Sequence, residues 1–559
     1  MREATEHASR YNLNDRPWTA LYPAQVPERY VARVRNGVEL FQIAVDERPD
    51  SPAVYFFDQV LTHRELDEMA HATARALQEL GVKPGHRVGL YLQNDPQFII
   101  ALHAIWLIGA IGVMHNPMLK PRELAYQLKD SGATILICLS SLHSNAVEAV
   151  RDTAVRTIIA TSEFLLAGDE PPAILGNRSA DPPADVPTME AFFQRYAGQR
   201  VAGHDAAPED TALLCFTSGT TGPPKGAMIT HANVAYGEIY LQAARVSPDD
   251  VVMAGAPMFH VTGITGHIVA ARLNSAPLVM FHRFDPGEFL RWLEYWKGTF
   301  SILALTAYIA ILNHPDLPRR DISSLTKVYT GGAPVSPAFV QRFEDVTGKY
   351  IHNCYGMTET SSPTHIVPLG MRAPVDAITG AISVGIPSPN LFSAIADIET
   401  GDLLGPGEVG EIISMGPNVV AGYWGKPEET AHAMRGGVMH TGDVATRDEN
   451  GWFYVLDRAK DLIIVSGYKV WPRDVEDVLY EHPAVREAAV VGIPDDYRGE
   501  TVKAFVSLRP GFEQTTPEEL IEHCKALLSA YKYPRHLEIL PEIPKTTTGK
   551  IMRRELRPT

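Results

Sequence analysis

Short apolar runs alternate with amphipathic helical segments through the first 330 residues, and this rhythm constrains the fold more than any other feature. One helix is predicted to carry Leu66, Ala70 and Leu77 on its buried face and to end at Gly81. The strand candidates that alternate with such helices are residues 88–92, 134–138, 212–216, 277–281, 301–305 and 326–330. Alternation of this kind predicts an α/β protein with mostly parallel sheets.

The chain has 559 residues, which is too long for a single core, and its pattern changes twice. Short strands separated by tight turns begin near residue 391 and indicate a β-rich subdomain. About 100 residues remain after Asp457, enough for a small α+β domain. We therefore expect a large domain over residues 1–457, made of two α/β subdomains and the β-rich subdomain at about 391–457. A hinge at 458–461 and a small C-terminal domain at 462–559 complete the predicted organisation.

Charge and cysteine content exclude several classes of function. Lys and Arg number 50 and Asp and Glu number 66, so the net charge is −16. That charge argues against nucleic acid as a partner, because generic nucleic-acid binding needs a basic surface. The four cysteines lack metal-ligand spacing, and so few in so long a chain favour a reducing, cytoplasmic location. The apolar segment 98–114 is short and interrupted by glycines, so we expect a buried helix and strand and no integral membrane segment.

The strongest local signal follows the strand candidate at 212–216. Residues 217–226 read TSGTTGPPKG. Glycines in such a segment let backbone N–H groups converge on an anion, and Lys225 adds a positive charge. The spacing is not that of a Walker A loop, which needs GxxxxGK[ST] leading directly into a helix. We interpret the segment as a phosphate-binding loop, in preference to a flexible surface loop.

Three further clusters carry groups that suit a nucleotide, although each is a weak signal by itself. In YGMTET (355–360) an aromatic ring can stack on a base, and the carboxylate of Glu359 can hold Mg²⁺ against phosphate oxygens. Asp443 can accept hydrogen bonds from ribose hydroxyls, and Arg458 can donate to sugar or phosphate. Lys550 lies in a basic stretch at the C-terminus. The alternatives are an ordinary surface turn, a charged pair beside a hairpin and a solvated basic tail.

Together and in this order, the clusters resemble the acyl-adenylate-forming superfamily, which includes acyl-CoA synthetases, carrier-domain-adenylating enzymes and beetle luciferases. The resemblance covers nearly the whole chain through the segments TSGTTGPPKG, YGMTET, HTGD, DRAKDLIIVSGYKV and PKTTTGK. The run IIVSG and the opening DRPWTALYPAQVP are most similar to bacterial medium- and long-chain fatty acyl-CoA ligases. The resemblance implies ATP, Mg²⁺ and CoA as cofactor and co-substrates, and a C-terminal domain that acts as a mobile lid.

The resemblance also assigns roles to individual residues. It implies that the catalytic residues are Lys225, His260, Thr358, Glu359 and Lys550, with Mg²⁺ held by Thr217 and Glu359. The nucleotide and CoA contacts that it implies are Thr217, Ser218, Gly219, Thr220, Thr221, Gly222, Lys225, Gly332, Ala333, Pro334, Tyr355, Gly356, Thr358, Asp443, Val455, Arg458, Lys460, Gly467 and Lys550. In this scheme His260 separates the ATP and acyl sites, Lys550 bridges the acyl carboxylate and the α-phosphate, and Gly467 lines the pantetheine channel.

The implied activity is that of an ATP-dependent acyl-CoA ligase, which forms an acyl-adenylate and then transfers the acyl group to CoA. The acyl pocket is expected around Phe259, His260, Ile264 and residues 303–312. No Lys or Arg occurs in residues 301–313, so a medium- or long-chain monocarboxylate is favoured over a diacid. The alternatives are an alicyclic- or aryl-acid CoA ligase, an adenylating enzyme that loads a carrier protein or an amine, and a non-catalytic nucleotide-binding homologue. A homodimer is left open.

Overall fold

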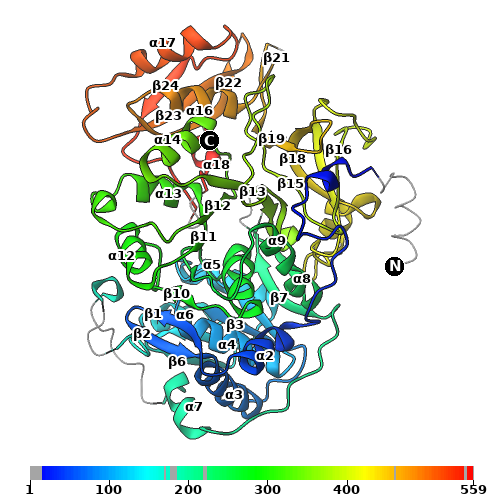
Figure 1. Cartoon of the computed structure of the whole chain (residues 1–559), viewed down its shortest axis with the longest axis vertical. Coiled ribbons are helices and arrows are strands. Elements are labelled where there is room, and N and C mark those ends of the chain that lie inside the picture. The colour runs from blue at the N-terminus through cyan, green and yellow to red at the C-terminus, as the bar shows by residue number, and fades with distance from the viewer. Residues whose placement is uncertain are drawn as a thin grey trace.

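The computed structural model describes residues 15–168, 172–176, 185–217, 223–458, 461–466, 468–495, 497–546 and 550–557, and every structural statement below concerns these residues. Figure 1 shows a large body that contains the N-terminal two thirds of the chain and a smaller C-terminal part, orange to red, at one end of it. Four sheets make up the fold, two in the α/β body and one each in the β-rich and C-terminal parts.

The first α/β subdomain is built on a six-stranded sheet in the order β6-β5-β3-β4-β7-β8, in which only β8 is antiparallel. Its strands are β3 (Arg87–Tyr91), β4 (Ile111–Met114), β5 (Ile135–Leu139), β6 (Thr157–Thr161), β7 (Thr211–Phe216) and β8 (Gly226–Thr230). The helices of this region are α3 (His63–Glu79), α4 (Pro96–Leu107), α5 (Pro121–Ser131), α6 (His143–Ala149), α7 (Met189–Arg195) and α8 (His231–Tyr236). The end of β7 leads into the predicted phosphate-binding loop.

The second α/β subdomain is built on a nine-stranded sheet in the order β15-β14-β13-β12-β11-β9-β10-β1-β2. The strands from β13 to β1 are parallel. At the edges β2 and β14 run in the opposite direction, and β15 pairs antiparallel with β14, so it runs in the direction of the parallel strands. They are β1 (Pro52–Phe56), β2 (Gln59–Thr62), β9 (Val252–Met253), β10 (Leu278–Met280), β11 (Phe300–Ala304), β12 (Lys327–Gly331), β13 (Ile351–Met357), β14 (Ser362–Ile366) and β15 (Ile386–Pro387). Helices α2 (Gly37–Glu47), α9 (Glu238–Ala243), α10 (Val261–Gly263), the π-helix η4 (Ile264–Val269), α11 (Ala270–Leu273), α12 (Pro286–Trp296), α13 (Leu305–Leu312) and α14 (Pro337–Thr347) connect or flank them.

Two smaller sheets follow. The antiparallel strands β16 (Phe392–Ala396), β17 (Gly410–Met415), β18 (Met439–Arg447) and β19 (Phe453–Arg458), with α15 (Pro427–Ala433), form the β-rich part. The C-terminal part has β20 (Ile463–Val465), β21 (Tyr468–Val470), β22 (Val485–Asp495), β23 (Gly499–Leu508), β24 (His536–Ile539), α16 (Pro472–Glu481), α17 (Pro517–Leu527) and α18 (Arg553–Leu556). Because it has a hydrophobic core of its own, centred on β22, β23, α16 and α17, it is built like an independent folding unit.

Several local predictions are confirmed, and two are wrong in detail. Residues 98–114 are a fully buried helix, α4, leading into the buried strand β4, and no described helix is long and apolar enough to cross a membrane. The sequence Asp95-Pro96 predicts a helix N-cap followed by a first-turn proline, and α4 does begin there, but the Asp95 side chain forms no capping hydrogen bond. Its carboxylate instead lies 2.9 Å from Nδ1 of His282, in a buried pair. The apolar pattern of residues 518–530 predicts a helix with Leu527 on its buried face, but Leu527 is 55% exposed.

Candidate active site

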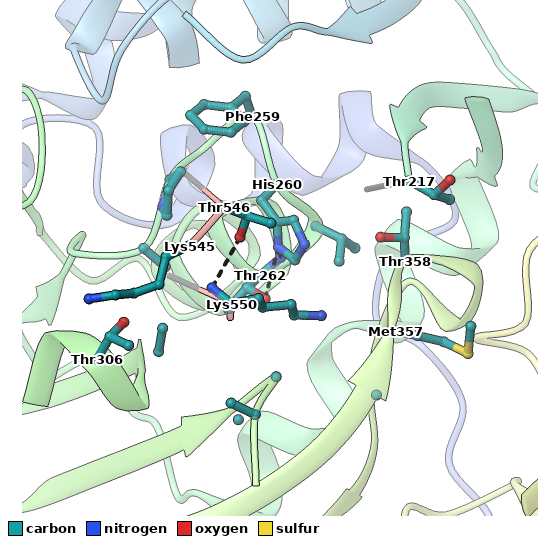
Figure 2. A pocket seen from close by; sticks show the side chains of 18 of the residues that line it. Thr217, Phe259, His260, Thr262, Thr306, Met357, Thr358, Lys545, Thr546 and Lys550 are labelled. Carbon is teal, nitrogen blue, oxygen red and sulfur yellow. Dashed lines mark hydrogen bonds between the residues drawn. The ribbon is translucent and has the colours of Figure 1, made fainter. Parts of the chain in front are cut away.

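A cavity of about 1230 Å³ lies where the carboxyl ends of β11, β12 and β13 face the C-terminal domain. Ligands of open parallel sheets bind at this edge, because the loops that follow the strands converge there. The large domain contributes Thr217, Lys225, His260, Gly332, Ala333, Gly356, Thr358 and Glu359, and the C-terminal domain contributes Lys545, Thr546 and Lys550. Figure 2 shows side chains from both domains pointing into this cavity.

Lys550 of the C-terminal domain lines the cavity and is hydrogen-bonded to Thr546. Its backbone N–H donates to Oγ1 of Thr546 (3.0 Å), and the N–H of Thr546 donates to the carbonyl of Lys550 (2.7 Å). A β-carbon added at Gly332 would lie 3.4 Å from Cε of Lys550, so the lysine stem packs against the turn that follows β12. The structure therefore brings Lys550 to the residues of the predicted nucleotide site from more than 200 positions away.

His260 lies beside Lys550 and is held in one neutral form (Figure 2). The N–H of Thr262 donates to Nδ1 of His260 (3.3 Å), which makes Nδ1 an acceptor. A neutral ring with this acceptor carries its proton on Nε2. Burial, assisted by the charge of Lys550, lowers the pKa of His260 to about 3. His260 is therefore a neutral hydrogen-bond donor at physiological pH and not a proton shuttle.

The loop that carries His260 is fixed by a residue that sequence reasoning missed. The side-chain amide of buried Asn94 donates to the carbonyls of Ala254 (3.0 Å) and Ala256 (2.9 Å), and its Oδ1 accepts from the N–H of Met258 (2.8 Å). Asn94 comes from the first subdomain, whereas the loop belongs to the second. In the sequence Asn94 appears only as part of a helix start, so no local signal distinguishes it.

Thr217, Lys225 and Glu359 lie on one wall of the cavity. The N–H of Thr217 donates to the carbonyl of Lys225 (2.9 Å), which closes the base of the predicted phosphate-binding loop. The ammonium of Lys225 lies 5.0 Å from the ring centroid of Tyr423, a cation–π distance. The hydroxyl of Tyr423 donates to Oε1 of Glu359 (2.7 Å). Tyr423 thus links the two charged groups, and it is a second residue that no sequence motif distinguishes.

The hydroxyl residues around Glu359 predict a loop position without a role in the core, but its side chain is buried and hydrogen-bonded to Tyr423. One carboxylate and the hydroxyl of Thr217 suit Mg²⁺, which binds few protein groups and takes its other ligands from phosphate oxygens and water. In the described part of the chain, no group of three or more His, Cys, Asp or Glu side chains could hold a metal by itself. The donor set therefore fits a metal that arrives with a nucleotide.

We expect Glu359→Gln to raise the Mg²⁺ concentration needed for half-maximal activity about tenfold or more and to lower kcat. The amide still accepts the hydrogen bond from Tyr423 but carries no charge. The measurement is initial rate against free Mg²⁺, with thermal unfolding recorded in parallel. Tyr423→Phe is the matched control, because it removes the hydrogen bond and keeps the carboxylate. An unchanged Mg²⁺ dependence in Glu359→Gln would remove this residue from the metal site.

The predicted nucleoside contacts gather in an adjoining cavity of about 310 Å³. Its lining includes Gly332, Ala333, Pro334, Tyr355, Gly356, Asp443 and Val455. The hydroxyl of Tyr355 donates to Oδ2 of Asp443 (2.7 Å), so the predicted adenine and ribose residues are in contact. Asp443 pairs in register with Arg458 across β18 and β19, which places the backbone of Arg458 beside it. Ser218, Gly219, Thr220, Thr221, Gly222, Lys460 and Gly467 lie outside the described residues.

The junction between the large and C-terminal domains is an ionic cluster around buried Asp457. Asp457 accepts from the N–H of Arg473 (3.3 Å) and from Nη1 of Arg553 (3.3 Å). Arg473 also donates to the carbonyl of Val335 (3.0 Å) in the large domain. Arg553 also forms a salt bridge with Glu476 (2.8 Å). These contacts hold the C-terminal domain in the orientation that places Lys550 in the cavity, and sequence reasoning identified none of them.

The other end of the large cavity is apolar. Its walls include Phe259, Val261, Phe284, Ile302, Leu303, Leu305, Ala307 and Ala310. Residues 303–310 therefore lie where the acyl pocket was expected, but Ile264 is buried and does not line the cavity. No Lys or Arg occurs in residues 301–313, but exposed Arg283 also lines this cavity. The cavity therefore combines an apolar part with the polar residues of the predicted phosphate site.

Residues 41–424 match the family model described as AMP-binding enzyme, and residues 474–550 match the AMP-binding enzyme C-terminal domain. The chain is 36% identical to the long-chain-fatty-acid–CoA ligase of Bacillus subtilis (strain 168), over 97% of this chain and 98% of that protein. It is 34% identical to the corresponding ligase of Escherichia coli O157:H7, with 97% of each covered. A feruloyl-CoA synthase of Amycolatopsis sp is 34% identical over 91% of this chain and 96% of that protein.

Solved structures of a CoA ligase and of MatB have the same architecture. The anthranilate CoA ligase AuaEII in complex with anthranoyl-AMP gives a TM-score of 0.84 at 26% identity, covering 95% of this chain and 98% of that one. ATP-bound MatB from Rhodopseudomonas palustris gives 0.82 at 27% identity, covering 93% and 98%. Both were solved with an adenylate or ATP bound.

Proposed function

The chain belongs to the AMP-binding enzyme family and is an acid–thiol ligase that uses ATP and CoA; from this premise we propose that its acid is a medium- or long-chain fatty acid and that the cavity residues carry the reaction. The observation that supports this most strongly is the meeting of three groups in one cavity. These are Lys550 from the C-terminal domain, the Thr217–Lys225 wall and the apolar end beyond His260.

The first half-reaction joins two anions. The carboxylate attacks the α-phosphorus of ATP, a mixed anhydride forms, and pyrophosphate leaves with the electron pair of the broken P–O bond. Negative charge gathers as the carboxylate and the α-phosphate approach, so fixed positive charge at that point lowers the barrier. Lys550 lies against Gly332 beside His260 and supplies this charge from one side, and Lys225 supplies it from the other. Mg²⁺, when bound at Thr217 and Glu359, neutralises phosphate charge.

The second half-reaction needs a path for a thiol. CoA attacks the acyl carbon, and AMP leaves carrying one oxygen of the original carboxylate. Lys550 is not required for this step. The described residues of the β20–β21 hairpin contribute nothing to the cavity lining. We therefore propose that the C-terminal domain, residues 462–559, rotates on the 1–457 domain about a hinge at 458–461 and exchanges Lys550 for this hairpin.

The substrate class can be tested with a panel of acids. The panel contains octanoate, palmitate, benzoate, ferulate and a C6 diacid, each assayed for pyrophosphate release with and without CoA. The proposal predicts AMP and thioester formation that depends on CoA and is fastest with the fatty acids. Preference for the aromatic acids would overturn the fatty-acid assignment. Preference for the diacid would instead point to Arg283 as a partner for a second carboxylate. Pyrophosphate exchange without CoA turnover would favour a carrier- or amine-loading enzyme.

We expect Ala310→Trp to lower kcat/KM for palmitate more than tenfold relative to octanoate. Ala310 lines the apolar end of the cavity, and an indole there removes volume that a long chain needs. Ala310→Ser, which is nearly isosteric, is the matched control. The measurement is kcat/KM for a series of saturated acids. An unchanged chain-length profile in Ala310→Trp would show that the acyl chain takes another route.

We also propose a cytoplasmic location and retain the homodimer as a prediction. All four cysteines are buried, and none forms a disulfide in the described structure, which suits a reducing compartment. Burial raises the pKa of Cys215 and of Cys354 to about 12, so these thiols are protonated and unreactive. Light scattering of the purified chain tests the oligomeric state.

A further inference from the structure

The cavity of about 310 Å³ that holds the nucleoside contacts continues outward between α14 of the large domain and the C-terminal domain. Arginine side chains gather at this outer end, and most of them have acidic partners. Arg473 pairs with Asp477 (3.3 Å). Arg557 pairs with Asp461 (3.0 Å). Arg553 is held by the acidic groups at the domain junction described above.

Two arginines at the outer end have no such partner. Arg342 comes from α14 and Arg509 follows β23, and the described structure records no acidic group paired with either. The nearby carboxylates are already used: Asp461 and Asp477 by the arginines named above, and Glu487 by Lys545 (2.7 Å). The cavity therefore has two cations, one from each domain, whose charge its own side chains do not neutralise.

The surroundings of Arg509 show the cost of this arrangement. Its Nε atom is buried and makes no hydrogen bond within the described structure. Burial, together with the charge of Arg342, lowers the pKa of Arg509 to about 10. The group still carries its charge at neutral pH, so two guanidinium groups repel each other across the domain interface. An unsatisfied buried donor and an uncompensated charge both destabilise a fold unless a ligand engages them.

We propose that the outer end of this cavity binds a phosphate-bearing anion between Arg342 of the large domain and Arg509 of the C-terminal domain. A guanidinium group offers two parallel N–H donors that match two oxygens of a phosphate. Two such groups facing each other can engage a doubly charged phosphate, whereas a carboxylate offers only one charge and two oxygens. The site is distinct from the proposed triphosphate site, because Thr217 and Lys225 line only the larger cavity, whereas Arg342 and Arg509 line only the smaller one.

An anion at this site would also favour one orientation of the C-terminal domain, a consequence that rests on the proposed rotation of this domain between the two half-reactions. Because Arg342 and Arg509 belong to different domains, the anion bridges them in the orientation that places Lys550 in the active site. A ligand that binds one orientation more tightly stabilises that orientation by its difference in affinity. The anion therefore favours the adenylate-forming orientation and slows the thioester step.

Binding is tested first, without reference to activity. Equilibrium dialysis of the full chain with radiolabelled inorganic phosphate, at constant ionic strength, is compared for wild type, Arg342→Gln, Arg509→Gln and Lys225→Ala. Arg64→Gln is the matched control, since Arg64 is exposed and paired with Asp50. We expect wild type to bind phosphate, and Arg64→Gln and Lys225→Ala to bind it with unchanged affinity. The affinity of Arg342→Gln and of Arg509→Gln for phosphate should be at least tenfold lower.

Phosphate binding that is lost in Lys225→Ala and unchanged in both arginine variants would belong to the triphosphate site and would overturn the proposal. Circular dichroism and thermal unfolding establish that each variant is folded, and Arg509→Lys, which keeps the charge but not the fork, should bind with intermediate affinity. Adenosine 3′,5′-bisphosphate is then added as competitor. Displacement of the phosphate assigns the site to a nucleotide phosphate, and failure to displace it assigns the site to free phosphate. Either result supports the proposed site.

The effect on the C-terminal domain is measured separately. Thioester formation from supplied acyl-adenylate and CoA is followed with and without phosphate. We expect phosphate to slow this step several-fold in wild type and not in Arg509→Gln. Equal slowing in both would show competition at the active site and would contradict the bridging role, whereas the dialysis result would stand even if the chain activated no acid.

Discussion

Lys550→Ala is expected to slow acyl-adenylate formation about 10²–10³-fold and to leave thioester formation from supplied acyl-adenylate within a few-fold of wild type. The lysine lies against Gly332 and beside His260, at the point where carboxylate and α-phosphate must meet. Its charge stabilises the transition state of the first step in a partly closed cavity, where water does not replace it. In the second step the attacking group is a thiol, and the proposed rotation of the C-terminal domain has moved Lys550 away.

The two half-reactions are measured on the same preparation, the first by pyrophosphate release and the second by thioester formed from synthetic acyl-adenylate. Lys532→Ala is the control, because Lys532 belongs to the same domain but pairs with Asp474 outside the active-site cavity. Equal losses in both half-reactions would show that Lys550 is structural or that the domain does not alternate. No loss in either would mean that the basic C-terminal stretch is only a solvated tail.

The free energy of unfolding is expected to fall by several kcal/mol between pH 7 and pH 5. The cause is a set of buried histidines whose pKa values are lowered to about 3 or 4, chiefly by burial: His63, His115, His231, His260, His267, His352 and His365. Below the ordinary histidine pKa of about 6.5 the unfolded chain binds protons that the folded chain does not, so acid favours unfolding. Each histidine can contribute at most about 2 kcal/mol over this range, and buried groups whose pKa is raised, such as Glu238 with a pKa of about 7, offset part of the total, so the net fall is smaller than the sum.

One buried histidine acts in the opposite direction. Although burial opposes it, the carboxylate of Asp95 raises the pKa of His282. Protonation of His282 therefore favours the folded state, which offsets part of the fall in the free energy of unfolding. The measurement is urea unfolding of the full chain at a series of pH values. His365→Gln is expected to reduce the slope of the free energy of unfolding against pH, because His365 is fully buried and is one of the histidines whose pKa is lowered. A free energy that stays constant from pH 7 to pH 5 would contradict the account.

The periodic parts of this fold could be predicted from the sequence, because local pattern determines them. The strands at 88–92 and 134–138 and the helix before Gly81 appear within a residue or two of their predicted places. The predictions of a phosphate-binding loop and of Lys550 and Glu359 as site residues also rest on local motifs. These motifs do not show which residues lie close together in space. Lys550 and His260 are nearly 300 positions apart and come together only through the packing of two domains.

The residues that sequence reasoning missed share one property, which is that their partners are remote. Asn94 contacts a loop 160 positions away. Asp95 does not cap α4 with its side chain and pairs instead with His282, 187 positions away. Arg473 and Arg553 look like ordinary surface arginines until the domains are assembled around Asp457. The same holds for Arg342 and Arg509, whose lack of acidic partners is visible only at the interface.

The central claim is that the acid is activated by attack of its carboxylate on the α-phosphorus of ATP. The most direct test is a complete reaction with a fatty acid labelled with ¹⁸O in both carboxylate oxygens, followed by mass spectrometry of all products. The account predicts one ¹⁸O in AMP, one in the acyl-CoA and none in pyrophosphate, because the oxygen that links acyl and adenylyl groups leaves with AMP. Unlabelled AMP, or label found in pyrophosphate or inorganic phosphate, would contradict it.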